Sequence, residues 1–284
     1  MIENRTAADV EQEIRDYWRS SIVEMAPGTI RFSGYPIQDL MGNVSFPDMV
    51  WLLTRGELPS RPQAALLEAA LVAGVDHGPQ APSIGVARMA ITCGVGLNNA
   101  MGSAVNVLGD VHGGAGEQCM ELLHDIARRM DDGDDLKTAV AGGIAWYQAE
   151  RSRFLPGFGH RFHRPEDPRS PRMFALAEQA VSDGHIDGRF LAIGREIQVQ
   201  IDAAKGKPVP MNIDGATAVV YAELGFPQPL ARGLFCLSRS VGIMAHAWEQ
   251  MNQDVRIKGV TPKAYIGTYD GPPQRPLPDR GEAE

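Results

Sequence analysis

Apolar residues recur every three or four positions through most of this chain, which is the spacing of one helix face. Strictly alternating runs, which are typical of half-buried strands, are nearly absent. In chain order, the pattern predicts helices at 11–20, from Ser45 to Gly56, and at 61–73, 94–108, 117–130, 171–183, 188–204 and 229–251. Helices without strands indicate an all-α fold.

Several helix ends carry their own signals. Ser45 can cap a helix, Pro47 suits a first turn, and Asp48 complements the positive helix end. Gly56 ends that helix, and Gly74 ends the next one. The amphipathic helix 117–130 has four predicted inward positions: Met120, Leu123, Ile126 and Met130.

Other segments interrupt the helices. Residues 31–40 are predicted to form a turn-rich connector, and Asp76-His77-Gly78-Pro79 breaks the helical pattern. Residues 268–284 are rich in proline, so we expect a tail that is either poorly ordered or laid over a neighbouring subunit.

Composition narrows the class of protein. The 284 residues are 44% apolar and 22% charged, which is typical of a soluble globular chain. A net charge of −8 argues against nucleic acid as a general partner, but it allows a local basic pocket for an anion. No apolar run reaches the roughly 20 residues that span a bilayer, and the first residues lack the apolar core of a signal peptide. We therefore expect no membrane association and a cytoplasmic protein.

The cysteines favour the same compartment. Cys93, Cys119 and Cys236 lie in apolar sequence and form no CxxC pair. They are expected to be free core thiols in a reducing cytoplasm rather than a disulfide or zinc framework.

The stretch 154–169 is the strongest candidate for chemistry. Gly157 and Gly159 let the backbone turn sharply and let a ligand come close. His160 and His163 follow, together with several arginine and aspartate side chains. Loops with this composition often do chemistry, because a structural loop rarely needs so many donors. The alternative is a proline-rich surface turn with solvated charges.

Gly-Phe-Gly-His160, followed nine residues later by the end of Asp167-Pro168-Arg169, resembles the signature of the citrate synthase superfamily. The resemblance runs from about Arg31 to Gly267. It implies a large helical domain (1–113 and 227–284) with a smaller helical CoA-binding domain (114–226) inserted, and an active site in the cleft between them. It also implies a homodimer whose subunits share active-site residues.

The resemblance implies three catalytic residues. His112, in Asp110-Val-His-Gly-Gly-Ala-Gly-Glu117, would bind the thioester carbonyl, and a nearby helix N-terminus would keep it neutral. His160 would handle the proton on the keto or hydroxyl oxygen, and Asp214 would move a proton at the acyl methyl carbon. The alternatives are a histidine that caps a buried turn for His112, and a turn or helix cap for Asp214. The glycines near His112 also suggest a nucleotide-binding loop, but this interpretation is weak because no strand precedes them.

The resemblance also implies binding residues. Arg169 and Arg239 match arginines that grip substrate carboxylates, for which the planar guanidinium is suited. His77 matches a substrate ligand, with a buried hydrogen-bonded histidine as the alternative. The remaining positions would contact coenzyme A: the backbone of Pro156, Gly157, Phe158 and Gly159, and the side chain of Arg164 near its phosphates.

Two departures from the synthase pattern matter. Synthases carry Asp-His-Glu where this chain has Asp76-His77-Gly78-Pro79, a form that resembles citryl-CoA lyases and the lyase module of ATP-citrate lyase. Thr261 replaces an arginine that binds a carboxylate in the partner subunit, a loss of roughly 2–5 kcal/mol for a buried pair. Either Lys263 or Arg275 compensates for the missing arginine, or the substrate differs from citrate. In the second case the acid carries one carboxylate fewer than citrate, or an apolar group in its place.

The resulting hypothesis is a CoA-dependent lyase that cleaves citryl-CoA, or a similar 3-hydroxy-3-carboxyacyl-CoA, to acetyl-CoA and a 2-keto acid such as oxaloacetate. The choice of a lyase over a synthase rests on residues 76–79 and on the short N-terminal half. The first alternative is a citrate or 2-methylcitrate synthase, and the second is a non-catalytic acyl-CoA-binding paralogue. No metal is expected, because the seven histidines are scattered and none forms an i, i+4 zinc pair with a carboxylate.

Overall fold

The computed structural model describes residues 6–160, 162–163, 165–262 and 264–278. Within them the chain is mainly helical, with one small antiparallel sheet in the order β1-β2-β3. The elements are α1 (Ala7–Asp16), β1 (Val23–Ala26), β2 (Thr29–Phe32), β3 (Tyr35–Pro36), α2 (Ile37–Leu40), α3 (Phe46–Arg55), α4 (Arg61–Gly74), α5 (Pro82–Thr92), α6 (Leu97–Val105), α7 (Ala115–Asp131), α8 (Leu136–Glu150), α9 (Arg169–Ser182), α10 (Arg189–Lys205), α11 (Ile213–Glu223) and α12 (Gln228–Met251). None of the helices in the described residues is long and apolar enough to cross a membrane.

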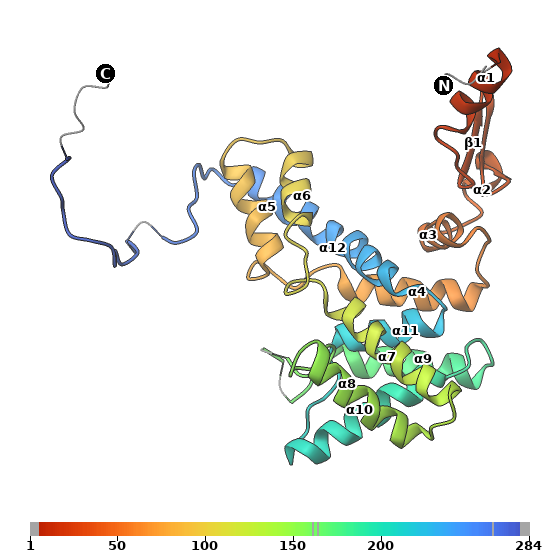
Figure 1. Cartoon of the computed structure of the whole chain (residues 1–284). Helices are drawn as coiled ribbons and strands as arrows, with labels where there is room; N and C mark the ends of the chain where they lie inside the picture. The colour runs from red at the N-terminus through yellow and green to blue at the C-terminus, as the bar shows by residue number, and fades with distance from the viewer. Residues whose placement is uncertain (1–5, 161, 164, 263, 279–284) are drawn as a thin grey trace.

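Helix α12 connects two hydrophobic cores. Its first half contributes Ala231 and Leu234 to the main core, which is built mostly from α4 and α7 to α11. Its second half contributes Ile243 and Ala247 to a smaller core with α5 and α6. Figure 1 shows α12 running from the α5–α6 pair toward α4 and α11. Residues between these halves, including Arg239, therefore lie at the junction of the two cores.

Most of the predicted helices are confirmed. Helix α3 begins and ends as predicted, with a reciprocal capping box between Ser45 and Asp48 and a left-handed Gly56 after its last residue. Helices α4, α6, α7, α9, α10 and α12 fall within a few residues of their predicted ranges. Of the four predicted inward positions in α7, Met120, Leu123 and Ile126 are fully buried and Met130 is half-buried.

Four helices were missed: the four-residue α2, which lies inside the predicted connector 31–40, and α5, α8 and α11. Helices α5, α8 and α11 each contain an interior glycine, which favours a break when the sequence is considered alone. In α8, a side chain at Gly143 would collide with Ile126 of α7, so this glycine permits close helix packing. Gly215 in α11 has a similar role, because a Cβ there would collide with the backbone of Gly157. Gly143 and Gly215 therefore reflect tertiary contact rather than the end of an element, whereas a Cβ at Gly85 of α5 would meet open space.

The strands contradict the expectation of helices alone in the first forty residues. Strands β1 and β2 pair from Val23–Phe32 to Ala26–Thr29, and β3 continues the sheet inside the predicted connector 31–40. Pro27-Gly28 forms the turn and was the available signal. Helix α1 also begins and ends four residues earlier than predicted, at the capping box of Thr6.

The cysteines are only partly as expected. Cys119 is buried, and its burial raises the pKa of the thiol to about 12. Cys236 is half-buried, whereas Cys93 is exposed, so the prediction of three core thiols is wrong for Cys93. Cys93 follows the last residue of α5, where the helix ends at the surface.

After α12, the described residues from 252 to 278 contain no helix or strand and have exposed side chains. Figure 1 shows this segment leading away from α5 and α6. The main core includes Trp51 of α3 and side chains of α4 together with α7 to α11. The separation of a small domain (114–226) from a large domain (1–113 and 227–284) stays a prediction.

Candidate active site

Two adjoining cavities contain the predicted active-site residues. An inner cavity of about 150 Å³ is lined by His77, His112, His160, Arg169, Asp214 and Arg239, among others. An outer cavity of about 840 Å³ shares His77, His112, His160 and Asp214 with it. All six side chains predicted for catalysis or acid binding therefore meet around the inner cavity, although they span residues 77 to 239.

The loop that carries His160 lies against the segment before Asp214. The amide of Gly159 donates to the carbonyl oxygen of Pro210 at 2.8 Å, and the amide of Asn212 donates to that of Gly157 at 2.9 Å. The Asn212 side chain also donates to the Gly159 carbonyl oxygen at 2.7 Å. These hydrogen bonds fix the two segments side by side, which brings His160 and Asp214 to one cavity.

Glycine is required where these segments touch. Gly157 has a φ of +82°, and a Cβ there would stand 2.6 Å from the Cα of Gly215. The glycine pattern predicts that a ligand comes close at Gly157, but the backbone of α11 occupies that space. A Cβ at Gly215 would collide in turn with the Gly157 carbonyl oxygen. The two glycines form a backbone-to-backbone contact behind the site.

Asp214 is positioned by the first turn of α11. The Asn212 side chain caps this helix by accepting hydrogen bonds from the amides of Asp214 and Gly215. Burial raises the pKa of the Asp214 carboxyl, while the charges of Arg169 and Arg239 partly offset this rise. Among the described residues, no hydrogen bond to the carboxylate contributes to this shift. A desolvated carboxylate without hydrogen-bond donors is a stronger base than one in water.

This raised pKa predicts how stability depends on pH. Between the ordinary and the raised pKa, the folded state holds the Asp214 proton more tightly than the unfolded state, so the free energy of unfolding falls as pH rises. We expect Asp214→Asn to be more stable than the wild type at pH 7, with the difference vanishing below about pH 4. Urea unfolding of both proteins across this range measures the difference. A variant less stable than the wild type at pH 7 would contradict the prediction.

His112 is held by the first turn of α5. Its Nε2 accepts the amide hydrogen of Ser83 at 3.2 Å and lies 3.0 Å from the Ser83 hydroxyl. With Nε2 as acceptor, the neutral ring carries its proton on Nδ1. Burial lowers the pKa of His112, and the charge of Arg239 lowers it further. The neutral state predicted from the sequence thus has burial as its main cause.

His160 has a matching arrangement. Its Nδ1 accepts the amide hydrogens of Phe162 at 3.1 Å and His163 at 3.0 Å. Its neutral ring therefore carries the proton on Nε2. Burial and the neighbouring His163 lower the pKa of His160, which keeps this imidazole neutral near pH 7. His112 and His160 each retain one N–H group for a substrate oxygen.

Arg169 is paired within the chain. Its Nε and Nη2 donate to the two carboxylate oxygens of Asp167 at 3.0 and 2.8 Å, and Nη1 donates to the carbonyl oxygen of Ala73 at 3.1 Å. Burial alone would raise the pKa of Asp167, but these hydrogen bonds hold it below its ordinary value. Three of the five guanidinium N–H groups are thereby used, which leaves two for a ligand.

Arg239 has more free donors. This residue is 5% exposed, and its Nε donates to the Gly74 carbonyl oxygen at 3.0 Å. Its guanidinium carbon lies 4.9 Å from the centre of the Phe235 ring, which fixes its plane. This single hydrogen bond among the described residues leaves four guanidinium N–H groups for an anion in the cavity.

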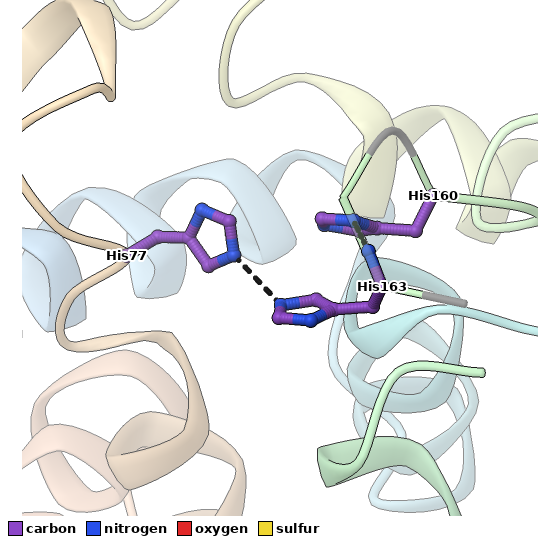
Figure 2. Close-up of side chains that lie close together, drawn as sticks. All are labelled: His77, His160 and His163. Atoms are coloured by element: carbon purple, nitrogen blue, oxygen red, sulfur yellow. Dashed lines mark hydrogen bonds between the residues drawn. The ribbon is translucent and has the colours of Figure 1, made fainter. Parts of the chain in front are cut away.

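His77 belongs to a cluster that sequence spacing did not reveal. Its Nε2 lies 3.0 Å from the Nε2 of His163, and its ring centre lies 5.3 Å from that of His160. Figure 2 shows the three imidazoles converging from two loops. Burial lowers the pKa of His77, as does the charge of Arg169. The sequence pattern predicts no role for His163, because its partner is 86 residues away along the chain.

Other supporting residues were missed as well. Ser83, Asp167 and Asn212 each hold one of the predicted side chains in place. The available signals were an Asp two residues before Arg169 and an Asn at a helix-cap position two residues before Asp214. Ser83 had no signal, since helix α5 itself was not predicted.

The remaining predicted residues are only partly placed. Pro156 and Gly157 are buried, while Phe158 and Gly159 are half-buried. Arg164 and Lys263 lie outside the described residues. Thr261 and Arg275 are exposed in the segment after α12 and line neither cavity of this chain.

Comparison with known proteins identifies the family of the chain. The sequence pattern of the family "Citrate synthase, C-terminal domain" matches residues 13–71 and 60–259. The citrate synthase of Haloferax volcanii is 31% identical over 221 residues, which cover 77% of this chain and 54% of that protein. The chain spans about half the length of the curated relatives it matches.

Solved structures give a closer match in length. The citryl-CoA lyase from Hydrogenobacter thermophilus is 29% identical, with a TM-score of 0.80 over 92% of this chain and 97% of that chain. The ATP citrate lyase from Methanothrix soehngenii, solved with citrate and coenzyme A, has a TM-score of 0.74 at 18% identity and covers 94% of this chain and 45% of that chain. The predicted fold class is confirmed, and the chain belongs to the citrate synthase family.

Proposed function

We propose that this chain is a CoA-dependent carbon–carbon lyase of the citryl-CoA lyase type. It cleaves a 3-hydroxy-3-carboxyacyl-CoA such as citryl-CoA to acetyl-CoA and a 2-keto acid such as oxaloacetate. The observation that carries the proposal is the likeness to a citryl-CoA lyase over nearly the whole of both chains. The curated synthases, in contrast, are matched over only about half of their length.

The residues around the inner cavity support a division of roles. Arg239, with four free N–H groups, and Arg169, with two, bind carboxylates of the acid. His77 completes the acid site from the opposite loop. Because the inner cavity of about 150 Å³ is small, the acid binds there and the thioester extends into the outer cavity.

The acid–base steps follow from the two tautomers. His112 donates its Nδ1–H to the thioester oxygen and stabilises the enolate that forms when the carbon–carbon bond breaks. Asp214, in its protonated form, then returns a proton to the enolate carbon. In the reverse condensation, Asp214 removes that proton and His160 donates its Nε2–H to the keto oxygen. Cleavage requires His160 to accept the hydroxyl proton at Nε2. Its own ring proton must therefore first move to Nδ1, which gives up the hydrogen bonds from the amides of Phe162 and His163.

The remaining features belong to the same proposal. Residues 114–226 form the CoA-binding domain, with the backbone of 156–159 and Arg164 along the cofactor. The chain acts as a homodimer, and α12 offers an apolar face for it. Three residues spaced by three and four positions are 52%, 43% and 58% exposed: Val241, Met244 and Trp248.

The second candidate is a citrate or 2-methylcitrate synthase, which the similarity to the Haloferax volcanii enzyme favours. A synthase also hydrolyses the thioester, whereas a lyase does not. The experiment supplies acetyl-CoA and oxaloacetate and follows free thiol, and in parallel supplies citryl-CoA and follows oxaloacetate. The lyase proposal expects oxaloacetate from citryl-CoA without free thiol from acetyl-CoA. Rapid thiol release would overturn it in favour of a synthase.

A further inference from the structure

The imidazoles of His77, His160 and His163 converge beside the outer cavity (Figure 2). One ring nitrogen from each lies within 4.8 Å of the others. The ring centres of His160 and His163 are 4.4 Å apart. The proposed reaction uses His77 and His160 but gives His163 no role, so the cluster holds one more imidazole than the chemistry needs.

The spacing of the first two nitrogens suits a metal ion. Two nitrogen ligands, each about 2.0–2.1 Å from a tetrahedral zinc ion, stand about 3.3 Å apart. The Nε2 atoms of His77 and His163 are 3.0 Å apart and share a proton in the neutral pair. An ion can take the place of this proton when the rings move outward and turn so that both Nε2 lone pairs face it, and the proton of the donor ring moves to its Nδ1. A site made of imidazole nitrogens selects zinc, copper or nickel over magnesium or calcium.

His160 supplies the third nitrogen at a cost. Its Nδ1 accepts two backbone amides, so the nitrogen left for an ion is Nε2. The Nε2 proton must then move to Nδ1, which breaks these two hydrogen bonds. In tightly binding zinc sites the second ring nitrogen instead donates to an acceptor. The nearby charges of Arg169 and Arg239 also oppose a cation. These costs favour reversible binding over a permanent structural ion, and the outer cavity gives the ion access.

We propose that His77, His160 and His163 together bind one zinc-class ion reversibly, and that the bound ion excludes the acid substrate. Exclusion follows because the ion occupies two side chains that line the inner cavity. The exclusion rests on the proposed function, whereas the binding does not. Such an ion is an inhibitor of the enzyme and takes no part in the reaction.

Binding is tested without substrates on tag-free, metal-depleted protein, by zinc titration in competition with a chromogenic chelator. The wild type is expected to bind one ion per chain at this site, and His163→Asn to raise its dissociation constant more than about 10-fold. His77→Asn should have a similar effect. His185→Asn changes an exposed histidine outside both cavities and serves as the matched control. Circular dichroism verifies that each variant is folded.

The proposal is overturned if the wild type binds no zinc, or if His163→Asn and His77→Asn bind it as tightly as the wild type. Equal losses in the His185→Asn control would overturn it too, since the effect would not be specific to the cluster. These outcomes do not depend on which reaction the enzyme catalyses, so they stay separate from a failure of the proposed function.

Inhibition is tested with citryl-CoA, or with acetyl-CoA and oxaloacetate if the chain is a synthase. Free zinc is set by a metal buffer, because carboxylic acids chelate the ion. We expect zinc to raise the KM for the substrate that carries the acid carboxylates, and His163→Asn to need at least about tenfold more zinc for the same effect relative to its own metal-free rate. Full activity of zinc-loaded wild type would refute the exclusion.

Discussion

Asp214→Asn lowers the rate of carbon–carbon bond cleavage by about 10³-fold, within the range that a general acid or base contributes. The amide cannot hold or return the proton at the acyl carbon, yet it keeps the size of the carboxyl group. Since the Asn212 cap contacts only the backbone of residues 214 and 215, helix α11 should begin unchanged. The rate is measured with citryl-CoA at saturating concentration.

Asp187→Asn is the matched control, because Asp187 is exposed in the connection between α9 and α10. Its rate should equal that of the wild type. Coenzyme A binding by Asp214→Asn, followed by calorimetry, should also stay near the wild-type value. A fall of this size would exclude a non-catalytic binding paralogue. A rate within a few-fold of the wild type would show that Asp214 is not the proton donor.

Gly215→Ala should lower activity by about 100-fold, because an active-site displacement near 1 Å costs roughly that much. The added Cβ would stand 2.5 Å from the Met211 side chain and would collide with the Gly157 carbonyl oxygen. Relief requires the loop that carries His160 to move away from the helix that carries Asp214. We also expect a loss of about 1–3 kcal/mol in the free energy of unfolding, as is usual for overpacking.

Gly233→Ala is the control for this change. Gly233 lies in α12 with no atom within 4 Å of the added Cβ. Alanine there should leave the rate unchanged and stabilise the helix by about 0.5–1 kcal/mol. Steady-state rates and urea unfolding of both variants provide the comparison. An active, fully stable Gly215→Ala protein would mean that the two segments can separate without loss, contrary to the geometry described above.

The sequence predicted much of this fold because local signals were strong where they existed. Ser45, Asp48 and Gly56 define the ends of α3 through their own side chains and backbone, with no contribution from distant residues. Helices α8 and α11 were missed because tertiary contact requires a glycine inside each of them. Gly143 and Gly215 weaken a helix locally, but a larger side chain would collide with another part of the chain.

The candidate site shows the same contrast between residues with a local sequence signal and residues that matter through tertiary contact. His112, His160 and Asp214 were found by resemblance, and the structure brings them to one cavity. Their spatial partners were harder to find, since the spacing of Ser83 and His163 from the residues that they contact carries no periodic signal. Arg169 was predicted only to bind a substrate carboxylate. In the structure, two of its three side-chain hydrogen bonds go to Asp167.

The position of α12 has a consequence for how the molecule unfolds. One continuous helix supplies buried side chains to both hydrophobic cores. Neither core can therefore unfold without exposing part of a helix that also packs into the other. Heat should therefore dismantle them in one cooperative step. Arg239 lies at the midpoint of that helix, so the guanidinium proposed to bind the acid sits where local unfolding is least favourable.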